Sequence, residues 1–471
     1  MDYTTAVLIT LITYKVLLIA IGIWSNKKNQ SSDDYFIGGR TLGPWVAAIS
    51  AAASASSAWS LLGMSGAAYA MGLPAIWIVP AVVLGYSFNW LWLAPRIQQQ
   101  AHQKQSVTVT DFITSDAKEH KRKIILLSTF CIVFSFIFYI AAQFQAAGNM
   151  FAATFDMDIE LSIALGTAII LIYTLLGGFW AVSITDTVQG IIMVVTAVLL
   201  PTVALFVIGG PEQLWQQMQI AYSDTQMSWF GEYTGIYIVA FLLGTAGIGV
   251  GNPGQPHVVN RLMAIKDEAS VKQGAYIGIG WSVIIFVSML LVGWSAKVLL
   301  SSPVDGEQAL ITLAQQLLPS AIAGIVVAAT LSAIMSTADS QLLVAAGAIS
   351  YDLPKENKTK TLMSARLTVA VMCLLSMLLA IYAPKDIFSR VLFAWNALGA
   401  AFGPVLIVLL MKRYIAPNII LASIFLGFTS TVIFHWLPAL PGDVLERIVP
   451  FIASFLLCLA FSKKQYVRQE A

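Results

Sequence analysis

Long apolar runs separated by short polar segments dominate the chain. Thirteen of these runs are about as long as a membrane-spanning helix, because a hydrocarbon core of about 30 Å takes about 20 apolar residues in an α-helix. They lie near residues 4–25, 43–69, 73–96, 123–151, 160–179, 184–208, 233–250, 273–299, 318–344, 362–383, 388–412, 416–436 and 445–462. Irregular backbone cannot face lipid, so the pattern predicts an all-α membrane protein of about thirteen transmembrane helices.

Composition supports a membrane setting. Hydrophobic residues make up 58% of the 471, charged residues only 11%, and the mean hydropathy is +0.79. A water-soluble domain of this size does not have such a balance. Cys131, Cys373 and Cys458 lie inside apolar runs, which favours small core residues over disulfides or a zinc site. The first run follows Asp2 and has no clear cleavage site, so we expect a retained helix, not a signal peptide.

Basic residues favour one set of alternate loops. Most of the 26 lysines and arginines fall there, including Arg40 and the residues between helices seven and eight, Arg261, Lys266 and Lys272. The opposite loops contain Lys297, Lys385, Arg390 and Arg447, and the 209–232 loop contains Glu212, Asp224 and Glu232 but no base. By the positive-inside rule we expect the N-terminus outside and the C-terminus in the cytoplasm.

Two of the predicted helices contain sequence that is unfavourable for a continuous helix. Residues 50–58 are all Ala or Ser, and residues 244–254 contain five glycines and Pro253, with Pro256 close behind. These helices are five spans apart and therefore cross the membrane in opposite directions. Paired interruptions of this kind indicate an inverted repeat with a midplane binding site. The alternative is that the small residues only permit close helix packing.

Ionisable and hydroxyl residues within the apolar runs are the candidates for chemistry. Asp186 is expected to open the sixth helix, either as a helix cap or as a functional acid, because a charge at this depth is unfavourable. In the ninth helix Ser332, Ser336 and Ser340 share one face, with Thr337 and Asp339 beside them. Their oxygens suit a small hard cation. Hydroxyls can also bond back to their own helix, but that alternative does not explain Asp339.

Other polar residues in the spans have less specific interpretations. Lys15 lies too centrally in the first run to reach the lipid surface easily, so it is a candidate to pair with an acid that the sequence does not identify. Tyr139, Gln143 and Gln145 in the fourth helix are candidates either to contact a solute or to hydrogen-bond another helix.

Five motifs in collinear order identify a family resemblance. They are Asp34–Gly43, Gly177–Gln189, Gly254–Ala264, Met335–Leu343 and Ala394–Pro404. Together they resemble the sodium:solute symporter family over residues 3–465. Within that family, the Gly-Gln-Pro-His and Ala-Phe-Gly-Pro segments are most similar to sodium/proline symporters.

The resemblance implies a LeuT-like fold with an inverted five-helix repeat and broken second and seventh helices. The expected divisions are residues 1–42, the first repeat 43–208, the second repeat 233–413, and 414–471 with two peripheral helices. Alternating access would operate around a midplane site. No cofactor is expected beyond sodium as the coupling ion. The partners would be a small solute, sodium and the lipid bilayer, with no nucleic acid and a functional monomer.

The resemblance also assigns site residues. The sodium site would comprise the backbone carbonyls of Ala53, Ser56 and Ala333 and the hydroxyls of Ser336 and Thr337. The solute would contact Ser57, Tyr139, Gln143, Ile248 and Asn252. Arg40 matches a cytoplasmic-side arginine linked to coupling, and Asp186 matches an acid near the sodium pathway.

The chain departs from the proline symporters that it resembles. Those proteins have an aspartate at the position of Ala55, and a tryptophan and a tyrosine at the positions of Ile248 and Asn252. Asp339 takes the place of a serine that contributes to a second sodium site in sialic-acid members of the family. We therefore hypothesise a second cation site formed by Asp186, Asp339, Ser336 and Ser340, with proton coupling as an open alternative.

The prediction is a sodium-coupled symporter in the bacterial inner membrane that imports a small solute, with proline as the first candidate. Another amino acid, zwitterion, carboxylate or sugar is the alternative. We do not expect an enzyme, since His257 is predicted to lie in a cytoplasmic-side turn and no nucleophile–base set is evident. A membrane sensor is the alternative from another class, but the short tail after the last helix leaves no room for a signalling domain. Paired broken helices disfavour a passive channel.

Overall fold

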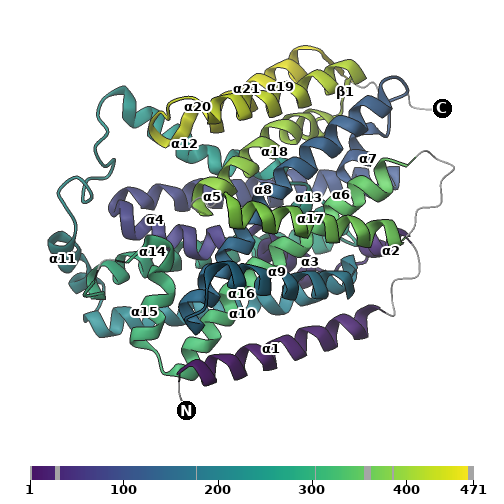
Figure 1. Ribbon diagram of the computed structural model, residues 1–471. Helices are drawn as coiled ribbons and strands as arrows, with labels where there is room; N and C mark the ends of the chain where they lie inside the picture. Colours follow the sequence, from purple (N-terminus) through teal and green to yellow (C-terminus); the bar gives the residue numbers. More distant parts are fainter. Residues whose placement is uncertain are drawn as a thin grey trace.

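The structure, a computed structural model, describes residues 3–26, 32–176, 178–302, 304–354, 362–383 and 387–464. It is a bundle of long helices (Figure 1). The uninterrupted ones are α1 (Tyr3–Asn26), α8 (Lys121–Phe155), α9 (Ile159–Leu176), α10 (Phe179–Ile208), α14 (Glu268–Leu299), α16 (Ser320–Gly347), α17 (Leu362–Tyr382), α18 (Ile387–Leu410) and α19 (Pro417–His435). Helix α1 lies along one edge of the bundle in Figure 1, and α19 lies along the opposite edge.

Three further spans are built from several short pieces. The first is α3 (Pro44–Ala55), η2 (Trp59–Gly63) and α4 (Met64–Met71). The second is η3 (Leu73–Trp77), α5 (Ile78–Phe88), η4 (Asn89–Leu93) and α6 (Ala94–Lys104), and the third is α12 (Ile236–Val250), η5 (Asn252–Gly254) and α13 (Pro256–Met263). The remaining elements are α2 (Ser32–Ile37), η1 (Gly38–Arg40), α7 (Val109–Thr114), α11 (Pro211–Ala221), η6 (Gly306–Gln308), α15 (Ala309–Leu317), η7 (Ala348–Asp352), η8 (Pro441–Asp443), α20 (Val444–Arg447), α21 (Val449–Ala460) and the antiparallel strands β1 (Arg413–Ile415) and β2 (Ser462–Lys464).

The number of spans is smaller than expected when length and hydropathy are both required. Among the described residues, ten helices are long and apolar enough to cross a membrane, or eleven if the bent α3–α4 pair is one span. Among the described residues, α9 contributes an apolar helix of Ile159–Ile172 and α21 has 12 residues, so both fall below the length that the count requires. The expected total of thirteen is therefore not confirmed, although the all-helical membrane architecture is.

Both predicted helix interruptions are present. The α3–α4 span bends by 66° where Ser56 and Ser57 leave the helix. In the other span, α12 ends at Val250, and Gln255 has extended backbone before α13 begins at Pro256. Glycine and proline explain the second break, because Pro256 lacks the N–H that would continue the hydrogen-bond ladder. The repeat boundaries that were inferred from the family resemblance stay a prediction.

The loops predicted to be basic meet at one end of the bundle. The amide of Lys266 donates to the carbonyl of Leu42, Arg40 donates to the carbonyl of Ser106, and β1 pairs with β2. The segment after α10 lies at the other end, where the amide of Leu73 donates to the carbonyl of Gln226. This separation agrees with the predicted alternation of loops, while the side that faces the cytoplasm stays a prediction. Lys385 and Gly177 lie outside the described residues.

Two expectations about the seventh and sixth helices are wrong. His257 and Arg261 do not lie in a cytoplasmic-side turn or loop; they belong to α13 and are buried. Beyond the break, α13 folds back into the bundle and packs against α3 and α6. Asp186 does not open its helix, because α10 begins at Phe179 after the extended Gly178. The neighbouring hydroxyls of Ser183 and Thr187 bond back to carbonyls of α10 instead of capping it.

Candidate ion and solute site

A cluster of oxygen atoms joins the end of α3 to the middle of α16. The hydroxyl of Ser336 donates to the carbonyl of Ala53 at 3.0 Å and is 3.3 Å from the carbonyl of Ala333. The hydroxyl of Thr337 donates to the carbonyl of Ser54 at 3.0 Å. All of these residues are fully buried. Oxygens that share a hard cation at about 2.3–2.6 Å lie roughly 3–4 Å from one another, so the observed separations suit such a cation.

The break in α3 explains why its carbonyls are available. A helix leaves its last carbonyls without amide partners one turn ahead, and these carbonyls carry the negative end of the helix dipole. The amide of Ser56 is shared between the carbonyls of Ala52 and Ala53, at 2.9 and 3.2 Å. Of the five residues predicted for the sodium site, Ala53, Ala333, Ser336 and Thr337 come together here. The predicted ligand from Ser56 is its backbone carbonyl, which stays a prediction, and its hydroxyl is 3.3 Å from that of Tyr86.

A second polar cluster lies beside the first, and an arginine occupies its centre. The Oδ2 atom of Asp186 accepts from Nη2 of Arg261 at 2.6 Å and from the hydroxyl of Ser54 at 2.9 Å. The same Nη2 donates to the hydroxyl of Ser340 at 2.6 Å. Ser340 also lies 3.3 Å from Oδ1 of Asp339. The predicted second-site residues are thus neighbours, and a guanidinium contacts two of them. Binding of a free cation there stays a prediction.

Helix α1 contributes to this region from the other side of α16. The hydroxyls of Tyr14 and Ser332 are 2.6 Å apart. Next to Tyr14, the ammonium of Lys15 contacts Sδ of Met335. Asp339 follows Met335 by one turn and is the acid within α16, so it is the candidate partner for Lys15, and their pairing stays a prediction.

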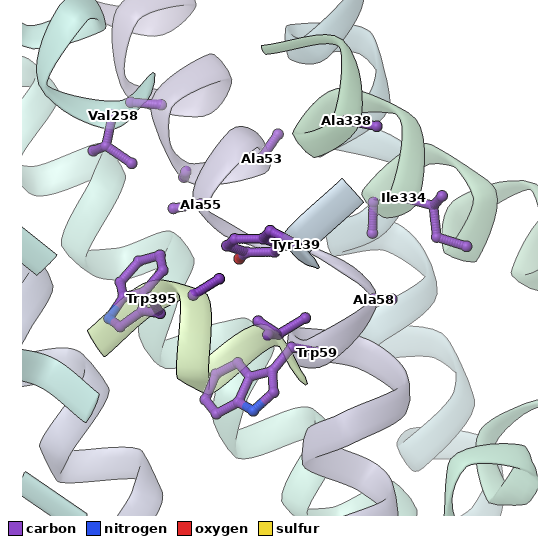
Figure 2. Close-up of a cluster of buried hydrophobic side chains, with 14 of the residues drawn as sticks. Ala53, Ala55, Ala58, Trp59, Tyr139, Val258, Ile334, Ala338 and Trp395 are labelled. Carbon is purple, nitrogen blue, oxygen red and sulfur yellow. The ribbon is translucent and has the colours of Figure 1, made fainter. Parts of the chain in front are cut away.

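A small cavity lies next to the break in α3. Its volume is about 20 Å³, which is room for about one water molecule. Five of its twelve lining residues are aromatic, and Figure 2 shows Trp59, Tyr139 and Trp395 around the end of α3 near Ala55. The lining residues include Ala55, Trp59, Tyr86, Tyr139, Ile248, Asn252, Phe286 and Trp395. Three of the five predicted solute contacts, Tyr139, Ile248 and Asn252, therefore line one cavity.

The other two predicted solute contacts hold the broken helix in place. Gln143 accepts from the amide of Ala58 through Oε1 at 2.9 Å, and the hydroxyl of Ser57 accepts from the amide of Trp59 at 3.1 Å. Both satisfy amides at the start of the half-helix formed by η2 and α4, which has no preceding turn to supply acceptors. Nε2 of Gln143 and Nε1 of Trp59 are buried donors without a hydrogen-bond partner. They are therefore available to an anionic group.

Polar contacts fix several further predicted residues. Gln145 accepts from Nη1 of Arg390 at 3.0 Å, which favours the helix-packing alternative for this residue. Asn252 accepts from Nδ2 of Asn89 at 2.7 Å, and the carbonyl of Ile248 accepts from Nε1 of Trp395 at 3.0 Å. Arg40 donates to the carbonyl of Ser106 at 3.0 Å, across the end of the bundle where the basic loops meet.

Sequence reasoning missed Ser54, Tyr86 and the internal position of Arg261. Ser54 lies within an Ala/Ser run in which no single serine stands out, and its role depends on Asp186 being opposite. Tyr86 is one of several aromatic residues in an apolar span. For Arg261 a signal existed in the nearby Pro256, which can begin a new helix as well as end one.

Comparisons with known proteins agree with this geometry. The osmoregulated proline transporter OpuE of Bacillus subtilis is 32% identical over 473 residues, covering 96% of this chain and 94% of that protein. The sodium/proline symporter of Escherichia coli is 31% identical over 478 residues, covering 97% and 94%.

Solved structures show the same fold. A substrate-bound, outward-open Na⁺-coupled sialic acid symporter superposes with a TM-score of 0.81 at 18% identity, covering 98% of this chain and 100% of that one. A nucleobase-cation-symport-1 family transporter superposes with a TM-score of 0.57 at 15% identity, covering 90% of this chain and 93% of that one. These likenesses confirm the expected LeuT-like architecture. The family description "Sodium:solute symporter family" matches residues 35–427, and the chain belongs to that family.

Proposed function

We propose that this protein is a sodium-coupled importer of a small solute, with proline as the first candidate, and that it works by alternating access. The observation that carries the proposal is the oxygen cluster in which Ser336 and Thr337 of α16 meet the carbonyls of Ala53 and Ser54 at the break in α3. In the proposed sodium site, oxygen atoms of five residues coordinate the ion: Ala53, Ser56, Ala333, Ser336 and Thr337.

Sodium bound there would link the broken helix to α16. An ion that binds more tightly in one conformation shifts the population toward that conformation. Each sodium entering at 100 mV, inside negative, contributes about 2.3 kcal/mol, which supports about fiftyfold accumulation of solute. Because the site lies beside the cavity near Ala55, binding of ion and solute would be linked.

The cavity supports a small solute with one apolar side and one anionic group. The apolar side would pack against Trp59, Tyr139 and Trp395. The carboxylate of the solute would accept hydrogen bonds from the unpaired donors of Trp59 and Gln143. These donors lie at the positive end of the half-helix formed by η2 and α4. At about 20 Å³ the cavity must expand to admit any amino acid, so the aromatic side chains have to move on binding. The printed names of the relatives in Bacillus subtilis and Escherichia coli favour proline.

A second candidate is a methylated or other zwitterion. Among the described residues that line the cavity, none is charged at neutral pH. A solute's ammonium group would therefore face aromatic rings, which favour cations that need no hydrogen-bond acceptors. Ala55, Ile248 and Asn252, which replace other residue types of the proline symporters, lie in this wall and support keeping the alternative.

Uptake into proteoliposomes tests the proposal. The purified protein is reconstituted with labelled proline outside, and a sodium gradient is imposed. We expect accumulation that disappears when sodium is equal on both sides or when a sodium ionophore is added. Competition by glycine betaine, pantothenate, sialic acid and glucose then ranks the solutes. Equilibration without accumulation would indicate a channel, and binding without uptake would indicate a sensor; either result would contradict the proposal.

The proposed setting is the bacterial inner membrane. Many apolar helices and bacterial symporter relatives support a multi-pass protein there. We also propose an outside N-terminus, a cytoplasmic C-terminus and a functional monomer. The grouping of basic loops at one end of the bundle supports the orientation.

A further inference from the structure

Lys15 lies in the middle of α1, where its charge cannot reach water along the helix. It is twelve residues from Tyr3 and eleven from Asn26, or about 17–18 Å from either end at 1.5 Å per residue. That separation exceeds the length of its side chain, so snorkelling to the lipid surface is excluded. The ammonium instead points toward α16, where it contacts Sδ of Met335. An uncompensated charge at this depth is strongly unfavourable.

Asp339 is the acid positioned to compensate Lys15. It follows Met335 by four residues on α16 and so lies one turn along the same helix face. Its side chain is fully buried, Oδ1 is 3.3 Å from the hydroxyl of Ser340, and Oδ2 has no hydrogen-bond partner. This carboxylate lies one turn along α16 from the Met335 sulfur that the ammonium of Lys15 contacts. Lys15 is thus the basic side chain that α1 directs toward this part of α16, and Ser340 is the hydroxyl neighbour of Asp339.

The neighbouring acid is balanced in the same way by another residue. Asp186 has Arg261 at 2.6 Å, and this guanidinium also contacts Ser340. The polar centre between α1, α10, α13 and α16 thus contains two carboxylates and two basic side chains. Its formal charge is zero without any bound ion. A free cation added to this cluster would have to displace one of the two tethered ones or leave an excess positive charge in the membrane interior.

We propose that Lys15 is a tethered cation for Asp339 and takes the place of an alkali ion that this carboxylate would otherwise bind. The inference rests on the proposed sodium coupling. It makes the first helix, outside the predicted repeats, part of the cation machinery. It also assigns Asp339 a protein partner in place of a second transported ion. The proposed site at Ser336 and Thr337 would then bind the only sodium ion of the cycle.

Counting bound sodium tests this directly and needs no known solute. Purified full-length protein is titrated with ²²Na⁺ at pH 7.0, and the wild type is compared with Lys15→Met, Lys15→Arg, Asp339→Ala and Lys15→Met/Asp339→Ala. The wild type and Lys15→Arg should bind about one ion with a Hill coefficient near one. Lys15→Met should bind about two, with a Hill coefficient above one. The double variant should return to about one, because both charges are gone.

Thermal unfolding of the same set keeps the proposal testable if Lys15→Met folds poorly. In that case the double variant should recover most of the lost melting temperature, since removing both charges leaves no unpaired ion. Two ions bound to the wild type, or one ion and unchanged stability in Lys15→Met, would overturn the proposal. No sodium bound to a folded wild type would instead refute the proposed function, while the rescue measurement would still decide the Lys15–Asp339 pairing.

Discussion

Ser336 and Ser340 lie one turn apart on α16 and contact different groups. Ser336 donates to the carbonyl of Ala53, in the cluster proposed to bind sodium. Ser340 lies against Asp186 and Arg261, where the charges are supplied by the protein itself. A single serine-rich helix face therefore serves both a candidate ion site and an internal ion pair. The sequence pattern predicted the face, but not the division between the two tasks.

Removing the hydroxyl of Ser336 should weaken sodium activation. In Ser336→Ala we expect the sodium concentration for half-maximal uptake to rise about tenfold, or about 1.4 kcal/mol, because one ligand is lost. This concentration is measured from initial rates of uptake recorded over a series of sodium concentrations. Ser332→Ala is the matched control, since Ser332 lies one turn earlier and contacts Tyr14 instead. Equal sodium curves for Ser336→Ala and the wild type would contradict the assigned site.

At the scale of elements, local composition predicted the two broken helices correctly. Ala/Ser and Gly/Pro runs weaken a helix wherever they occur, so residues 50–58 and 244–254 carried enough information. The path of the chain after the second break depends on tertiary packing. Arg261 was placed in a cytoplasmic loop because basic residues usually mark loops, whereas α13 carries it to Asp186. No local pattern contains that pairing, because its partner is 75 residues away.

The start of α10 was misplaced for a related reason. Ser183, Thr185 and Asp186 have the composition of a helix cap, and water-soluble helices commonly begin at such residues. In an apolar setting the hydroxyls bond to their own helix, as Ser183 and Thr185 do. The helix therefore begins at Phe179, and Asp186 lies two turns after its first residue.

Close packing between α5 and α12 gives a prediction about stability. A Cβ atom added at Gly249 would lie 2.1 Å from the carbonyl oxygen of Ala81, so Gly249→Ala must push the two helices apart. We expect the free energy of unfolding to fall by about 1–3 kcal/mol and the melting temperature in detergent to be clearly lower. Tryptophan fluorescence during heating measures the melting temperature. Gly280→Ala in α14 is the control, because its Cβ would meet nothing within 4 Å. Equal melting temperatures for the two variants would show that this crossing is not tightly packed.

For the whole molecule, the alternation of charge predicted which loops share an end, and the structure brings them together. The number of spans was less predictable. The apolar run near 160–179 is helical as α9, whereas the run near 445–462 is divided into the four-residue α20 and the 12-residue α21. Run length alone does not show that a run is divided between two short helices. The contacts between site residues were harder to predict from the sequence than the helical architecture, because they depend on tertiary structure.

Thiol labelling tests the predicted orientation. Cys131, Cys373 and Cys458 are buried, so the native protein should react little with a membrane-impermeant maleimide. Asp224 and Lys266 are exposed at opposite ends of the bundle. We expect Asp224→Cys to be labelled in intact cells, and Lys266→Cys to be labelled only after permeabilisation. The reverse pattern would place the N-terminus in the cytoplasm.

The contact between Arg261 and Asp186 has a consequence for how tightly transport is coupled. It joins α13, the inner half of a broken helix, to α10. Any motion that parts these helices exposes both charges, and losing a buried partner of this kind costs about 3–5 kcal/mol. Unless the motion supplies new partners, the separated state is disfavoured by roughly two to four orders of magnitude. Where binding of ion and solute offsets this cost, only the loaded carrier would complete the cycle often, and the internal ion pair would then limit slippage and preserve the gradient that drives uptake.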